Sequence, residues 1–324
     1  MRIMIRKKQQ GKGIKNRYPA RRDNKGDERR GYQARIATGF YIKFVAMVLL
    51  WLAFLIMPAV ANQVQKLSIV PAARDIVYSG QEKLHFSISW SGGVKIGDLW
   101  LDLENTDDGR QRIRAKVRDY GLFRLFYPVD DRFVTLIDKA SLLPLRYEVD
   151  QVEGHGYHHT RRTTRYDQKR FVATYRKNDG PPEIIDMRGP AHNEFSSFYF
   201  TRILALNRIR KPIVPTFADR KRHLVRVVGA GHKTMNNTIF GQVEVYAVRP
   251  RMEFKGLYDK DGDTTIWLTD DTCRVPMRIR SKILIGSLVA ELIDYNNPAC
   301  ARWHNWREQQ KERKKNRPPL GVGD

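Results

Sequence analysis

Residues 83–103 read KLHFSISWSGGVKIGDLWLDL, and this stretch decides the fold class. From Leu84 to Trp90 apolar and polar side chains alternate, which is the pattern of a strand with one buried face. Ser91-Gly92-Gly93 then supplies a hairpin turn, and the alternation resumes after it. The stretch therefore predicts a β-hairpin whose second strand carries a bulge at the Gly97-Asp98 pair.

Similar short segments follow, separated by loops rich in Gly, Pro, Asp or Lys. Strands are predicted at residues 111–118, 133–137, 145–152, 160–166, 171–176, 224–228, 233–238, 243–250, 264–269, 277–283 and 287–295. Such close spacing is typical of an all-β sheet or barrel. We expect a mostly β fold, a large curved antiparallel sheet or half-barrel with one packed helix, forming a single domain over residues 80–300. Residues 62–79 are interpreted as a linker, and residues 301–324 as a basic, disordered tail.

The helix is predicted from about Glu194 to Leu206, with Asn193 as its N-cap and Gly189-Pro190 stopping the chain before it. Its apolar side chains recur at helical spacing: Phe195, Phe198, Tyr199, Ile203 and Leu206. We expect this stripe to pack on the sheet, the alternative being contact with a ligand.

The sequence also contains a weak internal repeat. Lys95 to Leu103 resembles Leu284 to Leu292, because each places a glycine after an apolar residue and then alternates toward an acidic position. Two related hairpins in one continuous sheet would explain this similarity, although the strand pattern alone can also produce it.

The chain opens with a basic extension and an apolar segment. Residues 1–43 hold 14 Lys and Arg against 3 Asp and Glu. As a helix, the apolar run Phe44–Met57 would span about 21 Å, against about 30 Å for a bilayer core. Pro58 ends it, and Ala59-Val60-Ala61 has the pattern of a signal-peptidase site, so we expect cleavage before Asn62.

Two alternatives to cleavage remain open. Phe44 to Ala61 could stay as an inner-membrane anchor, or translation could begin at Met47. In each case the following domain would lie outside the cytoplasm, in the periplasm. A hydrophobic share of 41% is too low for a multi-pass membrane protein. The net charge of +24 is concentrated at the termini, so nucleic acid is not an expected partner.

Cys273 and Cys300 are the two cysteines of the chain. In an oxidising compartment they would form a disulfide bond, which is our expectation. Two buried thiols or a redox pair are the alternatives, and no C-x-x-C motif supports the second.

Other polar motifs have weaker chemical interpretations. Residues 155–159 contain three histidines, but neighbouring arginines would repel a cation, so we expect a surface loop. Residues 259–263 resemble the start of a calcium loop without its final Glu, and are interpreted as a turn. No metal site, cofactor or catalytic residue is predicted: no hydrolase or P-loop motif occurs, and Ser196-Ser197 has no histidine base identified near it in the sequence.

Several stretches resemble the bacterial exported proteins grouped as domain of unknown function DUF3108. The first stretch consists of residues 86–90 together with residues 93–97, and the next two are residues 126–131 and 193–202. The last stretch begins at residues 266–271 and continues through Pro276 to residues 285–287. The resemblance covers roughly residues 80–295. It implies a location in the envelope of a Gram-negative bacterium and a β-rich fold, but no reaction. The expected architecture is also similar to that of periplasmic lipoprotein carriers, whose curved sheet surrounds an apolar cavity.

The leading hypothesis is a non-enzymatic binding protein with an apolar concave face for a lipid or another amphiphile. The residues assigned to that face are Trp90, Trp100, Phe133, Trp267 and Leu288. A basic flank would meet anionic headgroups or envelope polymer, and is made of Arg208, Arg210, Lys211, Arg220, Lys221 and Arg222. An ordinary filled core is the plainer alternative. Two other functions remain as alternatives. The protein could be a structural partner of another envelope protein, or it could hydrolyse an envelope polymer with acids drawn from Asp130, Asp131, Asp270 and Asp271.

Overall fold

The computed structural model describes residues 67–121, 124, 128–154, 158–206, 211–252, 264–283, 286–304, 306, 309 and 312. The chain divides after Val64 into two units, and the fold below is that of the second. The predicted basic extension, the apolar segment at residues 44–61, His155 to Tyr157 and the turn at residues 259–263 lie outside the described residues.

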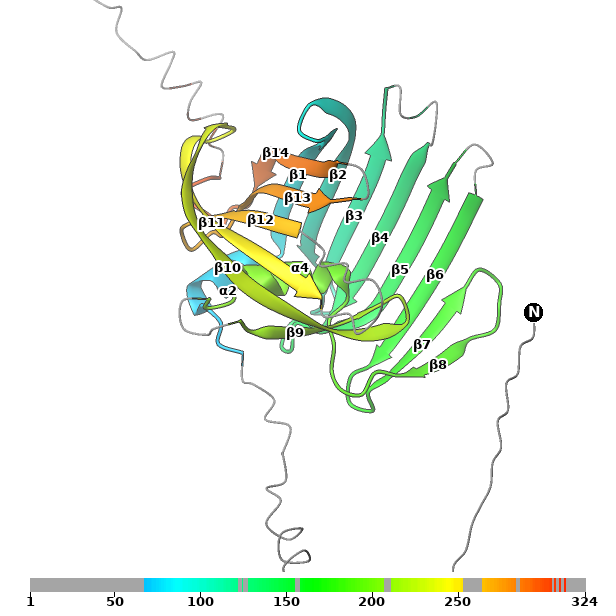
Figure 1. Ribbon diagram of the computed structural model, residues 1–324. Coiled ribbons are helices and arrows are strands. Elements are labelled where there is room, and N and C mark those ends of the chain that lie inside the picture. Colours follow the sequence, from blue (N-terminus) through cyan, green and yellow to red (C-terminus); the bar gives the residue numbers. More distant parts are fainter. Residues whose placement is uncertain are drawn as a thin grey trace, which may run out of the picture. The chain divides into compact units, whose positions relative to one another are not determined.

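The described chain forms one antiparallel sheet of fourteen strands (Figure 1). The first eight are β1 (Gln81–Trp90), β2 (Val94–Asn105), β3 (Gln111–Asp119), β4 (Val129–Ile137), β5 (Pro144–Glu153), β6 (His158–Asp167), β7 (Val172–Lys177) and β8 (Glu183–Asp186). The remaining six are β9 (Ile213–Ala218), β10 (Lys221–Thr238), β11 (Gly241–Met252), β12 (Thr264–Thr269), β13 (Pro276–Lys282) and β14 (Ser287–Asn296). This confirms the predicted mostly β fold with a large curved antiparallel sheet.

The order of strands shows two meanders joined at their ends. It runs from β8 down to β1, then from β14 down to β9, so that β1 pairs with both β2 and β14. The two repeated segments of the sequence thus include β2 and β14, on either side of β1. Gly97 is required on β2, because a Cβ there would lie 2.5 Å from the carbonyl oxygen of Arg118 on β3.

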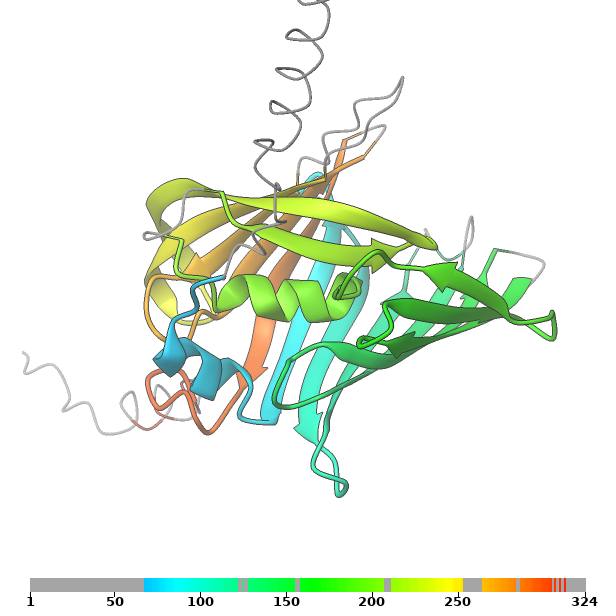
Figure 2. The same ribbon diagram turned by 90° about the horizontal axis from the view of Figure 1, so that it is seen from below.

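Helix α4 (Glu194–Arg202) lies inside the curve of the sheet (Figure 2). It begins where predicted, because the Asn193 side chain accepts a hydrogen bond from the Ser196 backbone N–H at 2.9 Å. It ends four residues earlier than predicted. Leu204 leaves the helix to form an isolated bridge with Ile69, and tertiary pairing has replaced the last helical turn.

The segment predicted as a linker contains a second helix, α2 (Pro71–Val77). Pro71 occupies the first turn of this helix, where its missing N–H costs nothing. Ala73 and Val77 are fully buried in one cluster with Tyr199 of α4. This helix therefore belongs to the folded domain.

The sequence pattern missed two strands and divided another. Both β8 and β9 lie at the edges of the sheet, where β9 can include Pro215. Residues 224–228 and 233–238 belong to one long strand, β10, whose register shifts between Gly229 and His232. A bulge thus occupies the position at which the sequence indicated a break.

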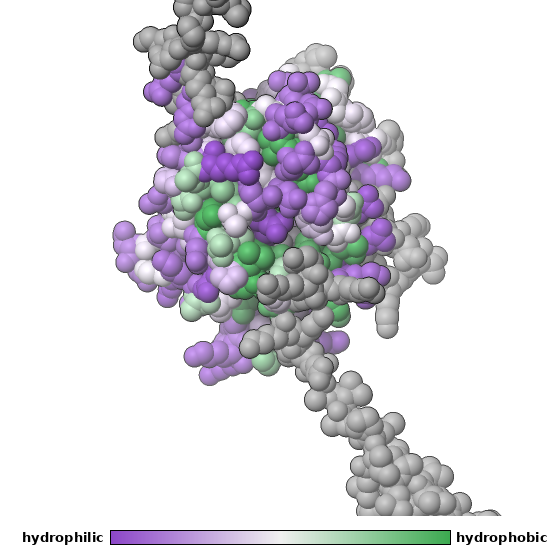
Figure 3. All heavy atoms as spheres, turned by 90° about the vertical axis from the view of Figure 1, so that its left-hand side faces the viewer, coloured by the Kyte–Doolittle hydropathy of each residue, from purple (hydrophilic) through white to green (hydrophobic). Residues whose placement is uncertain are grey.

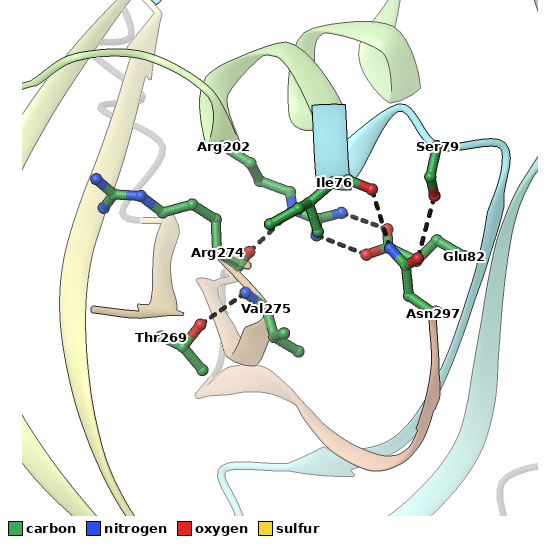
Figure 4. Close-up of polar contacts among 8 residues, drawn as sticks. All are labelled: Ile76, Ser79, Glu82, Arg202, Thr269, Arg274, Val275 and Asn297. Carbon is green, nitrogen blue, oxygen red and sulfur yellow. Dashed lines mark hydrogen bonds and ion pairs between the residues drawn. The ribbon is translucent and has the colours of Figure 1, made fainter. Parts of the chain in front are cut away.

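Two buried polar contacts hold α4 in place. At its start, Asn193 Nδ2 donates to Thr135 Oγ1 of β4 at 2.8 Å. At its end, the Arg202 guanidinium donates to both carboxylate oxygens of Glu82 on β1, at 2.5 and 2.8 Å, and both side chains are 0% exposed (Figure 4). Arg202 Nε also donates to the carbonyl of Arg274, at 3.0 Å. The helix is therefore fixed to β4, to β1 and to the turn between β12 and β13.

Candidate functional site

The two edges of the sheet approach each other along a seam. In the described part of the chain no backbone ladder joins β8 to β9. Instead the rings of Tyr166 on β6 and Phe217 on β9 meet edge to face, with centroids 6.0 Å apart. Arg220, in the turn after β9, contacts Glu183 of β8 at 3.1 Å and lies 5.6 Å above the ring of Tyr175.

Part of the β9 edge is already covered by the chain before α4. The His192 backbone N–H donates to the carbonyl of Pro215 at 2.8 Å, and the Phe217 N–H donates to the carbonyl of His192 at 2.7 Å. This cover leaves β9 little backbone with which to pair with β8. The seam is consequently held by side chains.

A small slot of about 60 Å³ opens at this seam. It is lined by Tyr147, Val149, Arg162, Thr164, Tyr166 and Tyr175 from β5 to β7, by Phe217, Ala218, Asp219 and Arg220 from β9 and its turn, and by Glu194 from α4. Four of these eleven residues are aromatic and four are charged, the charged ones being Arg162, Glu194, Asp219 and Arg220. We refer to this site as the seam slot.

The inner wall of the seam slot continues into the aromatic packing around α4. Phe195 of the helix contacts the ring of Phe133 at 5.1 Å between centroids and that of Tyr147 at 6.1 Å. Widening the slot would expose these rings, which are an apolar surface suited to a hydrocarbon chain.

The charged groups of the seam slot are only partly satisfied. Arg162 points to the concave face, where it contacts the Gln151 side chain, and its buried Nε has no acceptor among the described residues. Glu194 reaches the exposed rim, yet desolvation by the slot walls raises the pKa of its carboxyl. Asp219 adds to that rise and Arg162 opposes it. The arrangement offers a guanidinium donor to an anionic group beside an aromatic wall.

Sequence reasoning missed Arg162, because the whole segment Thr160 to Tyr166 was treated only as a strand. The signal was its parity: Arg162 alternates with Thr164 and Tyr166, so a basic side chain points to the same face as a buried tyrosine. Of the predicted basic flank, Arg220 lies at the seam slot, whereas Arg208 and Arg210 lie outside the described residues.

The five residues predicted to share one apolar face lie on both faces. By register, Trp90, Phe133 and Leu288 lie on the concave face with Leu84 and Phe86. Two predicted members lie on the opposite face instead: Trp100, stacked on His85 and paired with it across strands, and Trp267, paired with Arg278. The prediction of a single shared face is therefore wrong. On β2 a bulge opposite Ile88 and Ser89 shifts the register before Trp100, whereas Trp267 lies between the buried Ile266 and Leu268 and so points to the other face by simple alternation.

The four carboxylates considered for hydrolysis do not converge. Asp130 and Asp131 are neighbours on β4, with Asp131 buried, and point to opposite faces. Asp270 contacts His232 at 2.8 Å, and Asp271 accepts hydrogen bonds from Thr269, Cys273 and Trp303. Six strand intervals, about 29 Å along the sheet, separate β4 from β12. Asp271 therefore stabilises a turn.

Sequence reasoning also overlooked a histidine beside Ser196, four residues before it. His192 Nδ1 lies 3.2 Å from Ser196 Oγ, the spacing of a serine–histidine pair. Ser196 is 0% exposed and His192 is 4% exposed, and Ser196 Oγ accepts a hydrogen bond from the Asn193 N–H at 2.9 Å. Burial lowers the pKa of His192 to about 3. These contacts cap α4 and leave no path for a substrate to the hydroxyl.

Two further sequence motifs are placed by the structure. Cys273 and Cys300 are joined by a disulfide bond, which ties the turn after β12 to the segment after β14. His159 contacts Asp150 on the surface of the sheet. Within the described ranges, no group of three or more His, Cys, Asp or Glu side chains is arranged to hold a metal ion.

Comparison with known proteins places the fold in a family. Residues 85–293 match the model of a protein family of unknown function, DUF3108. A β-barrel-like protein of domain of unknown function DUF1849 from Brucella abortus is similar in structure, with 10% identity, 67% of this chain and 97% of that chain covered, and a TM-score of 0.47. The hypothetical protein CT021 from Chlamydia trachomatis is 8% identical, with 71% and 94% covered and a TM-score of 0.29.

No curated protein matches the chain. The family match covers well over half of the 324 residues and includes all of β2 to β13. The chain therefore belongs to the DUF3108 family of proteins of unknown function.

Proposed function

We propose that this protein is exported to the periplasm and binds an amphiphile, such as a lipid, without catalysing a reaction on it. The hydrocarbon part would enter the seam slot and lie against Tyr147, Phe195 and Phe133. The anionic part would remain at the mouth, beside Arg162 and Arg220. The observation that carries the proposal is the buried Nε of Arg162, which has no acceptor among the described residues and lies in a slot lined by four aromatic rings.

Binding requires the seam to widen. Sites for small ligands usually have volumes of about 300 to 1,000 Å³, and the closed slot has about 60 Å³. Opening would break exposed contacts such as Arg220 with Glu183, which contribute only about 0–1 kcal/mol each. It would also separate Tyr166 from Phe217, which are buried in one apolar cluster, and this separation is the main cost of opening. Opening would break no backbone ladder among the described strands.

The proposed location depends on the leader. The basic residues before the apolar run and the Ala59-Val60-Ala61 pattern support export. Within the part of the chain that the structure describes, no helix is long and apolar enough to cross a membrane. Sequencing the N-terminus of the protein from fractionated cells tests this, and a mature chain starting at Asn62 in the periplasmic fraction is expected. A cytoplasmic chain beginning at Met1 would contradict export.

Binding is tested with a fluorescent fatty acid and two variants of the same strand. R162Q removes the guanidinium at the slot, whereas R165Q removes an exposed one from the opposite face of β6. Losing a charge-assisted hydrogen bond should raise the Kd by roughly tenfold in R162Q and leave it unchanged in R165Q. Equal affinities of the two variants would refute the assignment of the slot. So would protein isolated from envelope extracts that carries no lipid in native mass spectrometry.

A further inference from the structure

The opposite, outer face of β3 to β6 carries a second concave site. Two clefts of about 350 and about 310 Å³ lie there, and they share Arg132 and Asp150, so they form one trough. We define the outer trough by six residues: Arg118, Asp130, Arg132, Glu148, Asp150 and Arg161. It extends over three rows of residue pairs, roughly 14 Å along the strands.

Positive charges oppose one another across the strands of this face. Lys116 of β3 is directly opposite Arg132 of β4, and Arg146 of β5 is directly opposite Arg165 of β6. Like charges in such positions repel and destabilise a sheet. Carboxylates offset part of this repulsion, since Asp150 is directly opposite both Arg132 and Arg161, and Glu148 contacts Arg146. An anionic group between the strands would relieve the remainder.

Two arginines of the outer trough are available for such a group. Among the described residues, no carboxylate lies within ion-pair distance of the guanidinium of Arg118 or Arg161. Arg132 has only a long contact, 3.9 Å from its Nε to Asp130. The guanidinium groups could therefore pair with carboxylate or phosphate oxygens without first losing a strong internal partner.

The carboxylates in the same trough narrow the class of ligand. Asp130, Glu148 and Asp150 would repel a densely charged polyanion such as nucleic acid, whose phosphates follow one another closely. They would instead accept hydrogen bonds from hydroxyl groups. A mixture of hydroxyls and widely spaced acids is the chemistry of an acidic polysaccharide.

A membrane surface fits this face less well. The large apolar side chains exposed in the described chain are Val94, Phe171, Ile184 and Leu224, and none of them lines the outer trough. The apolar residues that line its clefts are small (Pro128, Val129, Val134, Val149 and Val152) and offer a bilayer no large side chain to insert between its headgroups. We therefore propose that the outer trough binds an acidic glycan, an extended sugar polymer with spaced carboxylate or phosphate groups.

The six residues that define the outer trough lie on the opposite face of the sheet from the seam slot, although Val149 and Arg162 line both the slot and one of the two clefts. The test uses the full chain in a nonionic detergent, a polygalacturonate oligosaccharide as probe, and isothermal titration calorimetry. The variant R132Q/R161Q removes two charges from the trough. The matched control R249Q/R251Q removes two exposed charges from β11 and leaves the basic leader the same.

Loss of two charge-assisted contacts should raise the Kd of R132Q/R161Q by roughly tenfold or more, while the control stays within about twofold. A neutral glucan of equal length should bind at least about tenfold more weakly than the acidic glycan, since it offers the arginines no charge. Equal loss in the two double variants would overturn the proposal, as would equal binding of the neutral glucan. Tighter binding of inorganic polyphosphate, or of phosphatidylglycerol vesicles, would replace it with a phosphate or membrane site. Unchanged thermal melting of R132Q/R161Q would show that the fold is intact, and a variant that unfolds would be replaced by R161Q alone.

Discussion

The buried pair of Glu82 and Arg202 offers the sharpest test of the described packing. Replacing Arg202 by Met removes a guanidinium that donates to both Glu82 oxygens and to the Arg274 carbonyl. It leaves the Glu82 carboxylate in a site where its side chain is 0% exposed. Breaking one partner of a buried pair costs about 3–5 kcal/mol, because the remaining charge has lost its compensation.

The expected loss is measurable as a shift in melting temperature. For a domain of about 150–250 residues, 1 kcal/mol corresponds to about 2–4 °C, so the variant should melt roughly 6–20 °C lower. Urea unfolding at pH 7 should give the same free-energy difference with an unchanged m-value. A matched control is R110M, which breaks the exposed contact with Asp108 and should cost less than about 1 kcal/mol.

The double variant E82L/R202M separates lost pairing from lost packing. It removes both charges and keeps apolar volume, so its stability should recover to within about 1–2 kcal/mol of the original protein. If R202M costs no more than R110M, water reaches the pair and the description of a dry site is wrong. If the double variant loses as much stability as E82L and R202M lose together, the loss comes from side-chain shape and not from charge.

Three further predictions concern the ties around α4 and the C-terminal segment. Because the pKa of His192 is about 3 in the folded protein and about 6.5 in the unfolded chain, the unfolded state binds more protons below pH 6.5, and stability should fall by roughly 2 kcal/mol between pH 6.5 and 5. In urea titrations H192Q should lack this part of the pH dependence, and identical slopes would contradict a buried neutral imidazole. The N193A variant should lose about 1–2 kcal/mol of stability, because it lacks the helix cap, and T135V should lose less. Equal losses in the two variants would show that the bond to β4, rather than the cap, dominates. Removing the disulfide in C273S/C300S should cost about 3.5 kcal/mol in the chain-entropy model, and a melting temperature unaffected by a reducing agent in the original protein would argue against the bond.

The alternation of side chains was sufficient to predict most of the sheet. It depends on neighbours two residues apart, so Leu84 and Phe86 of β1 could be assigned to a buried face without knowing the topology. The cap of α4 was equally local, since Asn193 lies three residues before the N–H that it accepts from. Short-range patterns of this kind survive in the fold because tertiary packing reinforces them.

The seam slot could not be predicted in the same way. Its walls come from residues 147–175 and from residues 194–220, which meet only because the sheet curls until its two edges approach. The assignment of Trp100 failed for a related reason, since one bulge reverses the face of every later residue on a strand. Which residues share a face is therefore a property of register, and register is set by the whole sheet.

The ties at both ends of α4 limit how an amphiphile could reach the concave face. Moving the helix outward would strip the buried carboxylate of Glu82 of its partner and break the bond from Asn193 to Thr135. These costs greatly exceed those of separating Arg220 from Glu183 at the surface.

Figure 3 shows that, on the side carrying the β10–β11 hairpin, apolar surface is scattered in patches among hydrophilic residues. Access therefore depends on the seam, and a disulfide engineered between β8 and the turn after β9 should abolish amphiphile binding while leaving glycan binding to the outer trough unchanged.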